Sequence, residues 1–212
     1  LTPKELFDRV GYTITAKGLG GIPTLEIFKE VLAKACISTD HERYLAFIPT
    51  APSEYASLFD VVVSAASIYG GSWQEGAGAV FAENQALRWI SDLAGLPESA
   101  GGVFVQGGTI GNLSALVAAR AHAREKRPEI RRWADAASSE AHSSIKSATE
   151  VMDVELLLIA PDISGSMQGD EVEVTVKEYE QKNPGIGVFA IVATAGTTNL
   201  GIIDNLESIG QV

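Results

Sequence analysis

The fold is best predicted from residues 133–160, WADAASSEAHSSIKSATEVMDVELLLIA. Residues 133–138 predict a strand, residues 140–152 predict a helix, and residues 154–160 predict a second strand, because short apolar runs enclose a longer, helix-like segment. Strands that alternate with helices of this length are typical of an α/β fold with a mainly parallel sheet.

The same alternation extends on both sides of this stretch. Upstream, GVFV (102–105) predicts a short strand that a glycine turn joins to a helix with Leu113 and Leu116 on one face. Downstream, residues 170–182 predict a helix and GVFAIVAT (187–194) predicts a strand. The last run is continuously apolar, so we expect it to be buried on both faces. These patterns predict an α/β fold with helices flanking the sheet.

The first part of the chain has a less regular pattern. A glycine-rich stretch at residues 18–23 precedes a helix-like run at residues 24–35. Residues 78–96 predict a further amphipathic helix, which Gly95 and Pro97 end.

Composition limits the partners of this chain. Its 212 residues include 16 Lys and Arg against 27 Asp and Glu, and the formal net charge of −11 disfavours nucleic acid and anionic membranes. The single cysteine, Cys36, excludes an internal disulfide and is typical of a reducing compartment. No apolar run approaches the roughly 18 residues of a membrane-spanning helix, and residues 1–10 lack a signal-peptide pattern. We therefore expect a soluble, cytoplasmic protein. We expect no metal site, because the histidines are far apart in sequence.

Ligands of parallel α/β sheets bind outside the carboxyl ends of the strands, so we expect functional residues in the loops after residues 105, 138 and 194. The first loop contains Gly107, Gly108 and Thr109 at the start of a helix. Two glycines, a hydroxyl and a helix N-terminus are the parts of a phosphate-binding loop. A plain strand-to-helix turn, with Thr109 or Asn112 as N-cap, explains the same residues equally well.

The other two loops carry a histidine and two threonines. His142 opens the helix after the second strand, where an imidazole can stack on a planar ligand or donate a proton, although a lone histidine is more often structural. Thr197 and Thr198 follow the last strand, and Asp204 comes six residues after Thr198. These are turn and cap residues, with Asp204 capping the final helix, or else the two threonine hydroxyls hydrogen-bond the polar edge of a cofactor. Together the three loops suit a flat phosphorylated cofactor.

Three ordered motifs carry a family resemblance: GVFVQGGTIGNLSALVAAR (102–120), SSEAHSSIKSA (138–148) and VATAGTTNLGIID (192–204). With these motifs the chain resembles the group II pyridoxal-phosphate-dependent amino-acid decarboxylases, which include the aromatic-amino-acid, glutamate, histidine and 2,4-diaminobutyrate decarboxylases. Two upstream stretches, residues 43–66 and 71–97, are also similar to the N-terminal half of that family. The resemblance therefore covers nearly the whole chain.

The resemblance implies a role for each matching residue. Gly108 and Thr109 would bind the phosphate of pyridoxal 5'-phosphate, and Thr198 would hydrogen-bond the cofactor region. His142 would stack on the pyridine ring, and as the catalytic residue it would donate a proton to the carbanion left by CO2 loss. Thr50, in FIPTAP, would lie on the substrate side.

The resemblance also implies an organisation. The fold would be an aspartate-aminotransferase-like (type I) large domain, incomplete in this chain. Residues 1–75 would form a helical N-terminal region that contributes to the dimer and to the substrate side of the site. Within it, Trp73 would belong to a segment that lines the site at the subunit interface. Residues 76–212 would form the first part of the cofactor-binding domain and end before the Schiff-base lysine; Lys146 is expected to be an ordinary exposed lysine.

The implied activity is decarboxylation of an L-amino acid to its amine and CO2, in a homodimer. Ile110, Gly111 and Asn112 depart from the Glu-Ala-Asn that often follows the phosphate-binding threonine, but some glutamate-type members also carry isoleucine there. Two alternatives stay open: another type I enzyme, such as a lyase, aldolase or aminotransferase, and a non-catalytic half-protein that acts as a binding module.

Overall fold

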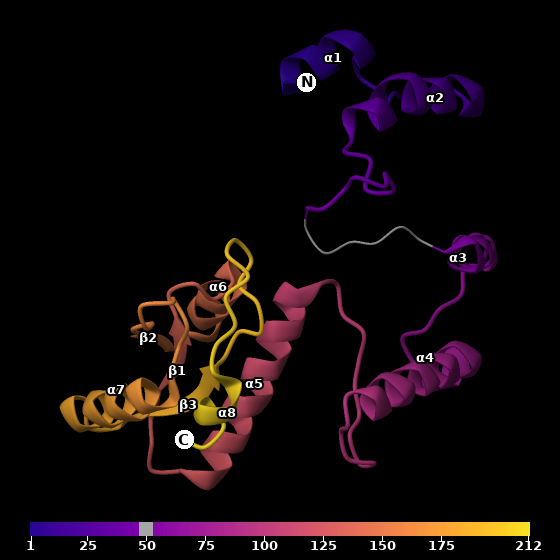
Figure 1. The fold of residues 1–212 in the computed structure, drawn as a ribbon. Helices are drawn as coiled ribbons and strands as arrows, with labels where there is room; N and C mark the ends of the chain where they lie inside the picture. The colour runs from indigo at the N-terminus through magenta and orange to yellow at the C-terminus, as the bar shows by residue number, and fades with distance from the viewer. Residues whose placement is uncertain (47–52) are drawn as a thin grey trace. The chain divides into compact units, whose positions relative to one another are not determined.

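The computed structural model describes residues 1–46 and 53–212, and its contacts divide the chain into two units, Leu1–Glu83 and Asn84–Val212 (Figure 1). The boundary predicted from the family resemblance, after residue 75, stays a prediction. Thr50 lies outside the described residues.

The first unit is helical. Its described elements are α1 (Pro3–Val10), α2 (Gly21–Ile27), the π-helical turn η1 (Phe28–Leu32), the 3-10 turn η2 (Ala33–Ala35) and α3 (Glu54–Ala66). Thr2 begins α1 with a capping box: its hydroxyl accepts the Glu5 N–H at 3.2 Å, while the Glu5 carboxylate accepts the Thr2 N–H at 2.7 Å. None of these helices contains a buried residue, and the side chains of Thr2 and Ser53 cap the starts of α1 and α3.

Helix α4 (Trp73–Leu93) confirms the helix predicted over residues 78–96 and begins earlier. It is interrupted at Gly76, where φ is −134° and ψ is 38°. A Cβ atom on Gly76 would lie 1.9 Å from the carbonyl oxygen of Tyr69, so only glycine allows this close approach of two backbone segments. Trp73 opens the helix with 59% of its surface exposed.

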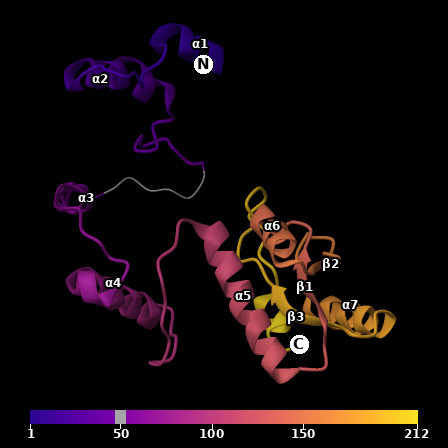
Figure 2. The same cartoon turned by 180° about the vertical axis from the view of Figure 1, so that it is seen from behind.

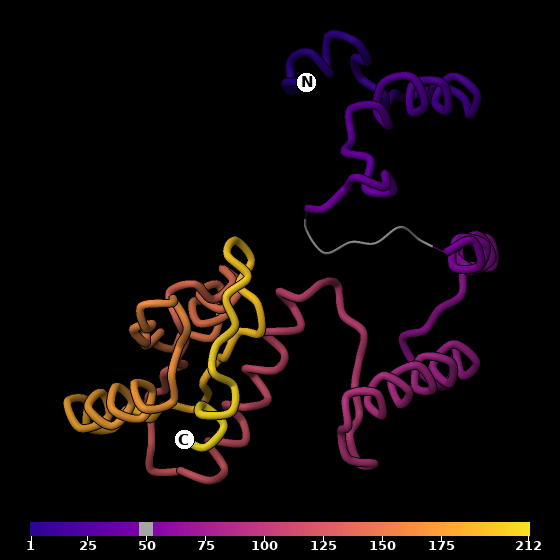
Figure 3. The backbone as a smooth tube through the Cα atoms, viewed as in Figure 1, coloured from indigo at the N-terminus to yellow at the C-terminus, as the bar shows by residue number. Residues whose placement is uncertain are grey.

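The second unit contains a parallel sheet. Its elements are α5 (Gly108–Lys126), β1 (Arg132–Ser138), α6 (Ser143–Met152), β2 (Glu155–Ile159), α7 (Gly169–Lys182), β3 (Ile186–Val192) and α8 (Leu206–Ile209). The strand order is β2-β1-β3, and both pairs are parallel (Figure 1). The predicted α/β fold is therefore confirmed, and Figure 3 traces its alternating path along the backbone.

Two apolar clusters cover the two faces of the sheet. On one face, α5 and α6 pack Leu116, Ile145 and Met152 against Ala137 of β1. On the other, α7 and α8 pack apolar side chains against Ala136. Figure 2 shows α5 running beside β3 and α6, as in the opposite view. Because successive residues of β1 point to opposite faces, one strand supplies both clusters.

Two details of the predicted sheet are wrong. Residues 102–105 are irregular, because an apolar run forms a strand only where it joins a ladder, and the described sheet consists of β1, β2 and β3. The most buried strand is β1 rather than the more apolar β3: residues 133–138 are all buried, whereas five of the seven residues of β3 are only partly buried. Position between two neighbours, more than apolar composition, determines burial here.

Candidate functional site

A cavity of about 600 Å³ opens at the carboxyl end of β1. It is lined by the end of β1, the following loop, the first turns of α6, β2 and the loop after β3: Ala137, Ser138, Ser139, Glu140, Ala141, His142, Ser143, Ile145, Lys146, Leu156, Leu158, Thr198 and Asn199. The structure thus brings together His142 and Thr198, two of the residues predicted to form the site. Lys146 is an exposed residue at the same cavity.

His142 is the N-cap of α6, as its predicted place at the opening turn requires. Its φ of −55° and ψ of 141° turn the chain out of the loop and into the helix. The ring nitrogen Nδ1 accepts the backbone N–H of Ser144 at 3.2 Å, which satisfies one of the first amide groups of the helix. The cap therefore holds the imidazole at the edge of the cavity.

The N-terminus of α5 is open. Its N-cap is Gly107, with φ at 87°, and no side chain caps the helix among the described residues. The alternative in which Thr109 or Asn112 serves as N-cap is therefore wrong. A Cβ atom built on Gly107 or Gly108 would meet nothing within 4 Å, so there is room beside the first amide groups. An uncapped, accessible helix N-terminus of this kind binds anions.

One hydrogen bond connects this helix N-terminus to the histidine. The side-chain amide of Asn112, one turn after Thr109, donates to the Ser144 hydroxyl at 2.8 Å. Ser144 is the residue whose backbone N–H donates to His142. Gly108 and Thr109 do not line the cavity itself, so this bond is the observed connection between the first predicted loop and the second.

The loop after β3 is held by buried polar contacts. Thr197 is buried and forms two hydrogen bonds with Ile202, from its own N–H to the carbonyl at 2.9 Å and from the Ile202 N–H to its hydroxyl at 3.0 Å. Thr198, the next residue, is exposed and lines the cavity. Thr197 therefore shapes the turn, and Thr198 is the hydroxyl available to a ligand.

Asp204 does not cap the last helix, contrary to the alternative considered from the sequence; Asn205 does, by accepting the Ser208 N–H. Asp204 is buried instead, and its two oxygens accept the backbone N–H groups of Met167 at 2.8 Å and Thr194 at 2.7 Å. The carboxylate thus joins the loop after β2 to the loop after β3. Local spacing could not reveal partners so distant along the chain.

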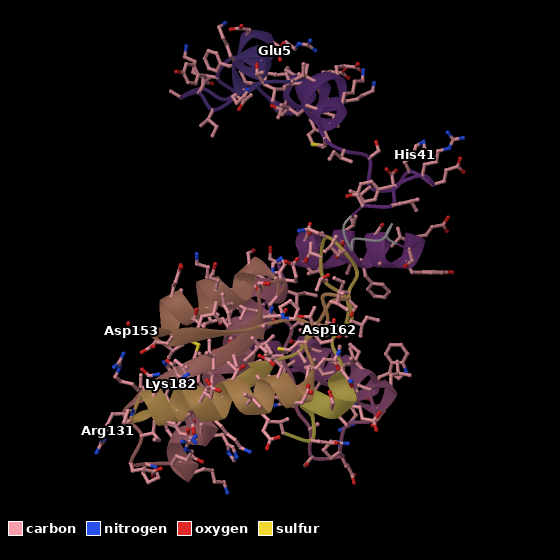
Figure 4. All side chains as sticks on the ribbon, turned by 60° about the vertical axis from the view of Figure 1, so that its left-hand side comes forward. Glu5, His41, Arg131, Asp153, Asp162 and Lys182 are labelled. Carbon is pink, nitrogen blue, oxygen red and sulfur yellow. The ribbon has the colours of Figure 1, made fainter. Side chains whose placement is uncertain are left out.

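Replacing Asp204 with alanine is expected to lower the free energy of unfolding by about 2–4 kcal/mol, because two buried N–H groups lose their acceptor. Urea unfolding at neutral pH would measure the loss. The matched control is Asp162→Ala: the Asp162 carboxylate, labelled in Figure 4, also accepts two backbone N–H groups but is exposed, so its loss should be under about 1 kcal/mol. Equal losses for the two variants would contradict the assignment.

Two buried polar side chains have no hydrogen-bond partner among the described residues. Ser138 lies at the carboxyl end of β1 and is one of the residues that line the cavity, although its hydroxyl oxygen is itself buried. Asp135 is different: neither carboxylate oxygen has a partner, the residue is 0% exposed, and burial raises its pKa from 3.8 to about 7. Asp135 is not among the residues predicted from the sequence, where its only signal is an acid within an alanine-rich strand.

Two negative findings concern only the described residues. Over residues 1–46 and 53–212, no three His, Cys, Asp or Glu side chains are grouped so that they could hold a metal ion. Within the same ranges, no helix has both the length and the apolar character needed to cross a membrane.

The parallel sheet, the open helix N-terminus and the cavity edged by His142 and Thr198 define a cofactor-binding α/β domain. Residues 24–212 match the model of the pyridoxal-dependent decarboxylase conserved domain, and the chain belongs to this family. The cofactor is accordingly pyridoxal 5'-phosphate. The open amide groups of α5 suit its phosphate.

The relatives of this chain include amino-acid decarboxylases with different substrate names. The chain is 30% identical to an aromatic-L-amino-acid decarboxylase of Bacillus atrophaeus, over 82% of this chain and 36% of the relative. It is also 30% identical to an L-2,4-diaminobutyrate decarboxylase of Rhizobium meliloti, over 88% of this chain and 37% of the relative. The chain thus spans little more than a third of the length of either relative.

Solved structures confirm the fold. All of this chain superposes on 49% of the glutamate decarboxylase domain of a Vibrio parahaemolyticus protein, with a TM-score of 0.85 and 24% identity. It also superposes on 45% of mouse CSAD, with a TM-score of 0.87 and 23% identity. The predicted type I fold, represented here by part of its large domain, is therefore confirmed.

Proposed function

We propose that the protein decarboxylates an L-amino acid, with pyridoxal 5'-phosphate, to the corresponding amine and CO2. One observation carries the proposal: the Asn112–Ser144 hydrogen bond ties an open, anion-binding helix N-terminus to a histidine at the edge of a 600 Å³ cavity. Family membership and relatives named as amino-acid decarboxylases support the choice of reaction.

Each residue of the site has a proposed role. Gly108 and Thr109 bind the phosphate through their N–H groups and the threonine hydroxyl, because the helix N-terminus favours a dianion. His142 covers the ring face and supplies a proton to the carbon that loses CO2. Thr198 donates a hydrogen bond at the edge of the ring. Thr50, outside the described residues, contacts the substrate.

When bound, pyridoxal 5'-phosphate supplies the electron sink that decarboxylation requires. The protein groups orient it: Leu156 and Leu158 supply apolar side chains to the lining of the cavity, and His142 lies at its edge. Holding a proton on a fixed imidazole places it beside the reacting carbon without a further diffusional step.

The proposal extends to the whole protein. Residues 76–212 form the first part of the cofactor-binding domain, and residues 1–75, with Trp73, contribute to the substrate side and to a homodimer in the cytoplasm. The lysine that binds the cofactor covalently, and the aspartate that pairs with its ring nitrogen, lie in the part of the family outside this chain. Lys146 is not that lysine.

The test uses the full-length enzyme. Titration with pyridoxal 5'-phosphate should produce a visible absorption band, and incubation with a panel of L-amino acids should release CO2 and the amine from at least one. Reduction with borohydride should label a peptide outside residues 1–212. A product formed only with a keto-acid acceptor would identify an aminotransferase instead, and no absorption change would favour the non-catalytic binding module.

A further inference from the structure

We propose that Asn112 and Ser144 are positioning residues that fix His142 in the tautomer protonated at Nε2. They form a directed chain of hydrogen bonds from α5 to the imidazole: the Asn112 amide to the Ser144 hydroxyl at 2.8 Å, and that hydroxyl to His142 Nδ1 at 2.9 Å. The chain begins one turn inside the helix whose N-terminus is open, and it ends on the ring at the cavity.

The direction of these bonds follows from the donors. A backbone N–H can only donate, so the 3.2 Å contact from Ser144 N to His142 Nδ1 requires an unprotonated Nδ1. The Asn112 Nδ2 group also donates, and it occupies a lone pair of the Ser144 oxygen. The hydroxyl hydrogen of Ser144 is then free to point at Nδ1, and all three bonds agree. In the neutral ring the proton must therefore sit on Nε2.

The surroundings make this arrangement rigid. Ser144 is 2% exposed, and Asn112 is partly buried, so water does not readily compete for their bonds. The neighbouring Ile145 and Leu116 belong to the apolar cluster that joins α5, α6 and β1. The polar chain is thus anchored at both ends to packed helices, and a change at Asn112 reaches His142, which lies thirty positions further along the chain, through one side chain.

The consequence for chemistry rests on the proposed function. Because Nδ1 accepts hydrogen bonds from Ser144 of α6, Nε2 is the ring nitrogen available to a ligand. It presents a hydrogen rather than a lone pair. A histidine fixed in this tautomer can donate a hydrogen bond or a proton from Nε2 without first reorienting.

The decisive experiment measures the tautomer directly. Histidine labelled with ¹⁵N in the full-length apoprotein, studied well above the ordinary histidine pKa of about 6.5, gives separate shifts for protonated and unprotonated ring nitrogens. His142 is assigned by the signal that His142→Gln removes. We expect an unprotonated Nδ1 and a protonated Nε2. A wild-type ring protonated at Nδ1 would overturn the proposal.

Asn112→Asp tests the direction of the chain with almost no change of size. A carboxylate can only accept, so it would take the Ser144 hydroxyl hydrogen and remove one of the two donors to Nδ1, while the Ser144 backbone N–H remains the other. The tautomer ratio should move about tenfold toward Nδ1–H, about the value of one hydrogen bond. In the double variant N112D/S144A the ratio should return to that of Ser144→Ala alone. Unchanged shifts in Asn112→Asp would overturn the proposal, since a packing role does not alter the tautomer.

A second readout uses the loaded enzyme. Ser144→Ala should lower kcat about tenfold and leave KM nearly unchanged, because the ring loses one of the two hydrogen bonds that orient it but not its contact with substrate. The control is Ser147→Ala, an exposed serine on the same helix, which should have no effect. Equal kcat for Ser144→Ala and wild type would contradict the catalytic consequence. The tautomer measurement needs no cofactor, so failure of the proposed reaction is distinguishable from failure of this inference.

Discussion

Asp135→Asn is expected to raise the free energy of unfolding by about 4 kcal/mol above pH 7 and to have little effect in acid. Asp135 lies on the central strand with none of its surface exposed and with no partner for either carboxylate oxygen among the described residues. Asparagine has the same size and the same unsatisfied polar character as the protonated acid, but it cannot ionise. The comparison therefore isolates the charge.

The pH dependence has a definite sign. Burial raises the pKa of Asp135 from 3.8 to about 7. Below pH 3.8 the acid is protonated in both the folded and the unfolded chain, and its stabilising contribution is complete. As the pH rises the unfolded chain ionises first, so this contribution is lost progressively until the pH passes 7. The difference between the two pKa values corresponds to about 4 kcal/mol.

Charged groups on the neighbouring elements do not offset this effect. Arg120 on α5 donates to the Met152 carbonyl at 2.7 Å, and Glu155 on β2 pairs with Arg132. None of them is among the causes that shift the pKa of Asp135. The ionised carboxylate would therefore face an apolar layer between the sheet and the two helices, without a compensating charge.

The measurement is urea unfolding of the full-length wild type and Asp135→Asn across this pH range. Asp153→Asn serves as the control, because Asp153 ends α6 as an exposed residue and the substitution removes the same charge at a site without burial. A stabilisation by Asp135→Asn that is the same at pH 4 and pH 8 would show that ionisation is not the cause. If Asp135→Asn were less stable than the wild type above pH 7, the effect would have the opposite sign, and the assignment would be rejected.

Thr109→Asp is expected to weaken the binding of pyridoxal 5'-phosphate at least a hundredfold without destabilising the protein. An acidic residue in the first turn of α5 favours the helix by interacting with its dipole. The same carboxylate would repel the phosphate and compete for the open N–H groups. Loss of charge-assisted hydrogen bonds of this kind corresponds to about 3 kcal/mol, or roughly a hundredfold in affinity.

Titration of the full-length apoprotein, followed by absorption or fluorescence quenching, gives the affinity, and thermal unfolding gives the stability. Thr109→Val removes only the hydroxyl and should weaken binding about tenfold. If the N-terminus of α5 is simply a helix start, Thr109→Asp will bind the cofactor as the wild type does. That outcome would remove Gly108 and Thr109 from the phosphate site.

Local sequence patterns identified most of the second unit. The apolar runs at 133–138 and 187–194 and the helical segments between them predicted the parallel α/β alternation, because such periodicities are set by the face that each element buries. The position of His142 at the start of a helix was also predictable, since the loops after parallel strands carry the site. The strand predicted at 102–105 is wrong, because these residues have the apolar composition of a strand but no neighbouring strand in the described sheet.

By itself, the sequence determined the element types, the order of the loops and, through three motifs, the family of the chain. Only the tertiary structure decided that β1 is the central strand, that Asp135 is sealed beneath two helices, and that Asn112 bonds to Ser144 across 32 positions. The physical reason is the range of the forces involved. Periodicity and capping act within a few residues, whereas burial and hydrogen-bond partners depend on which distant segments the strand order places side by side.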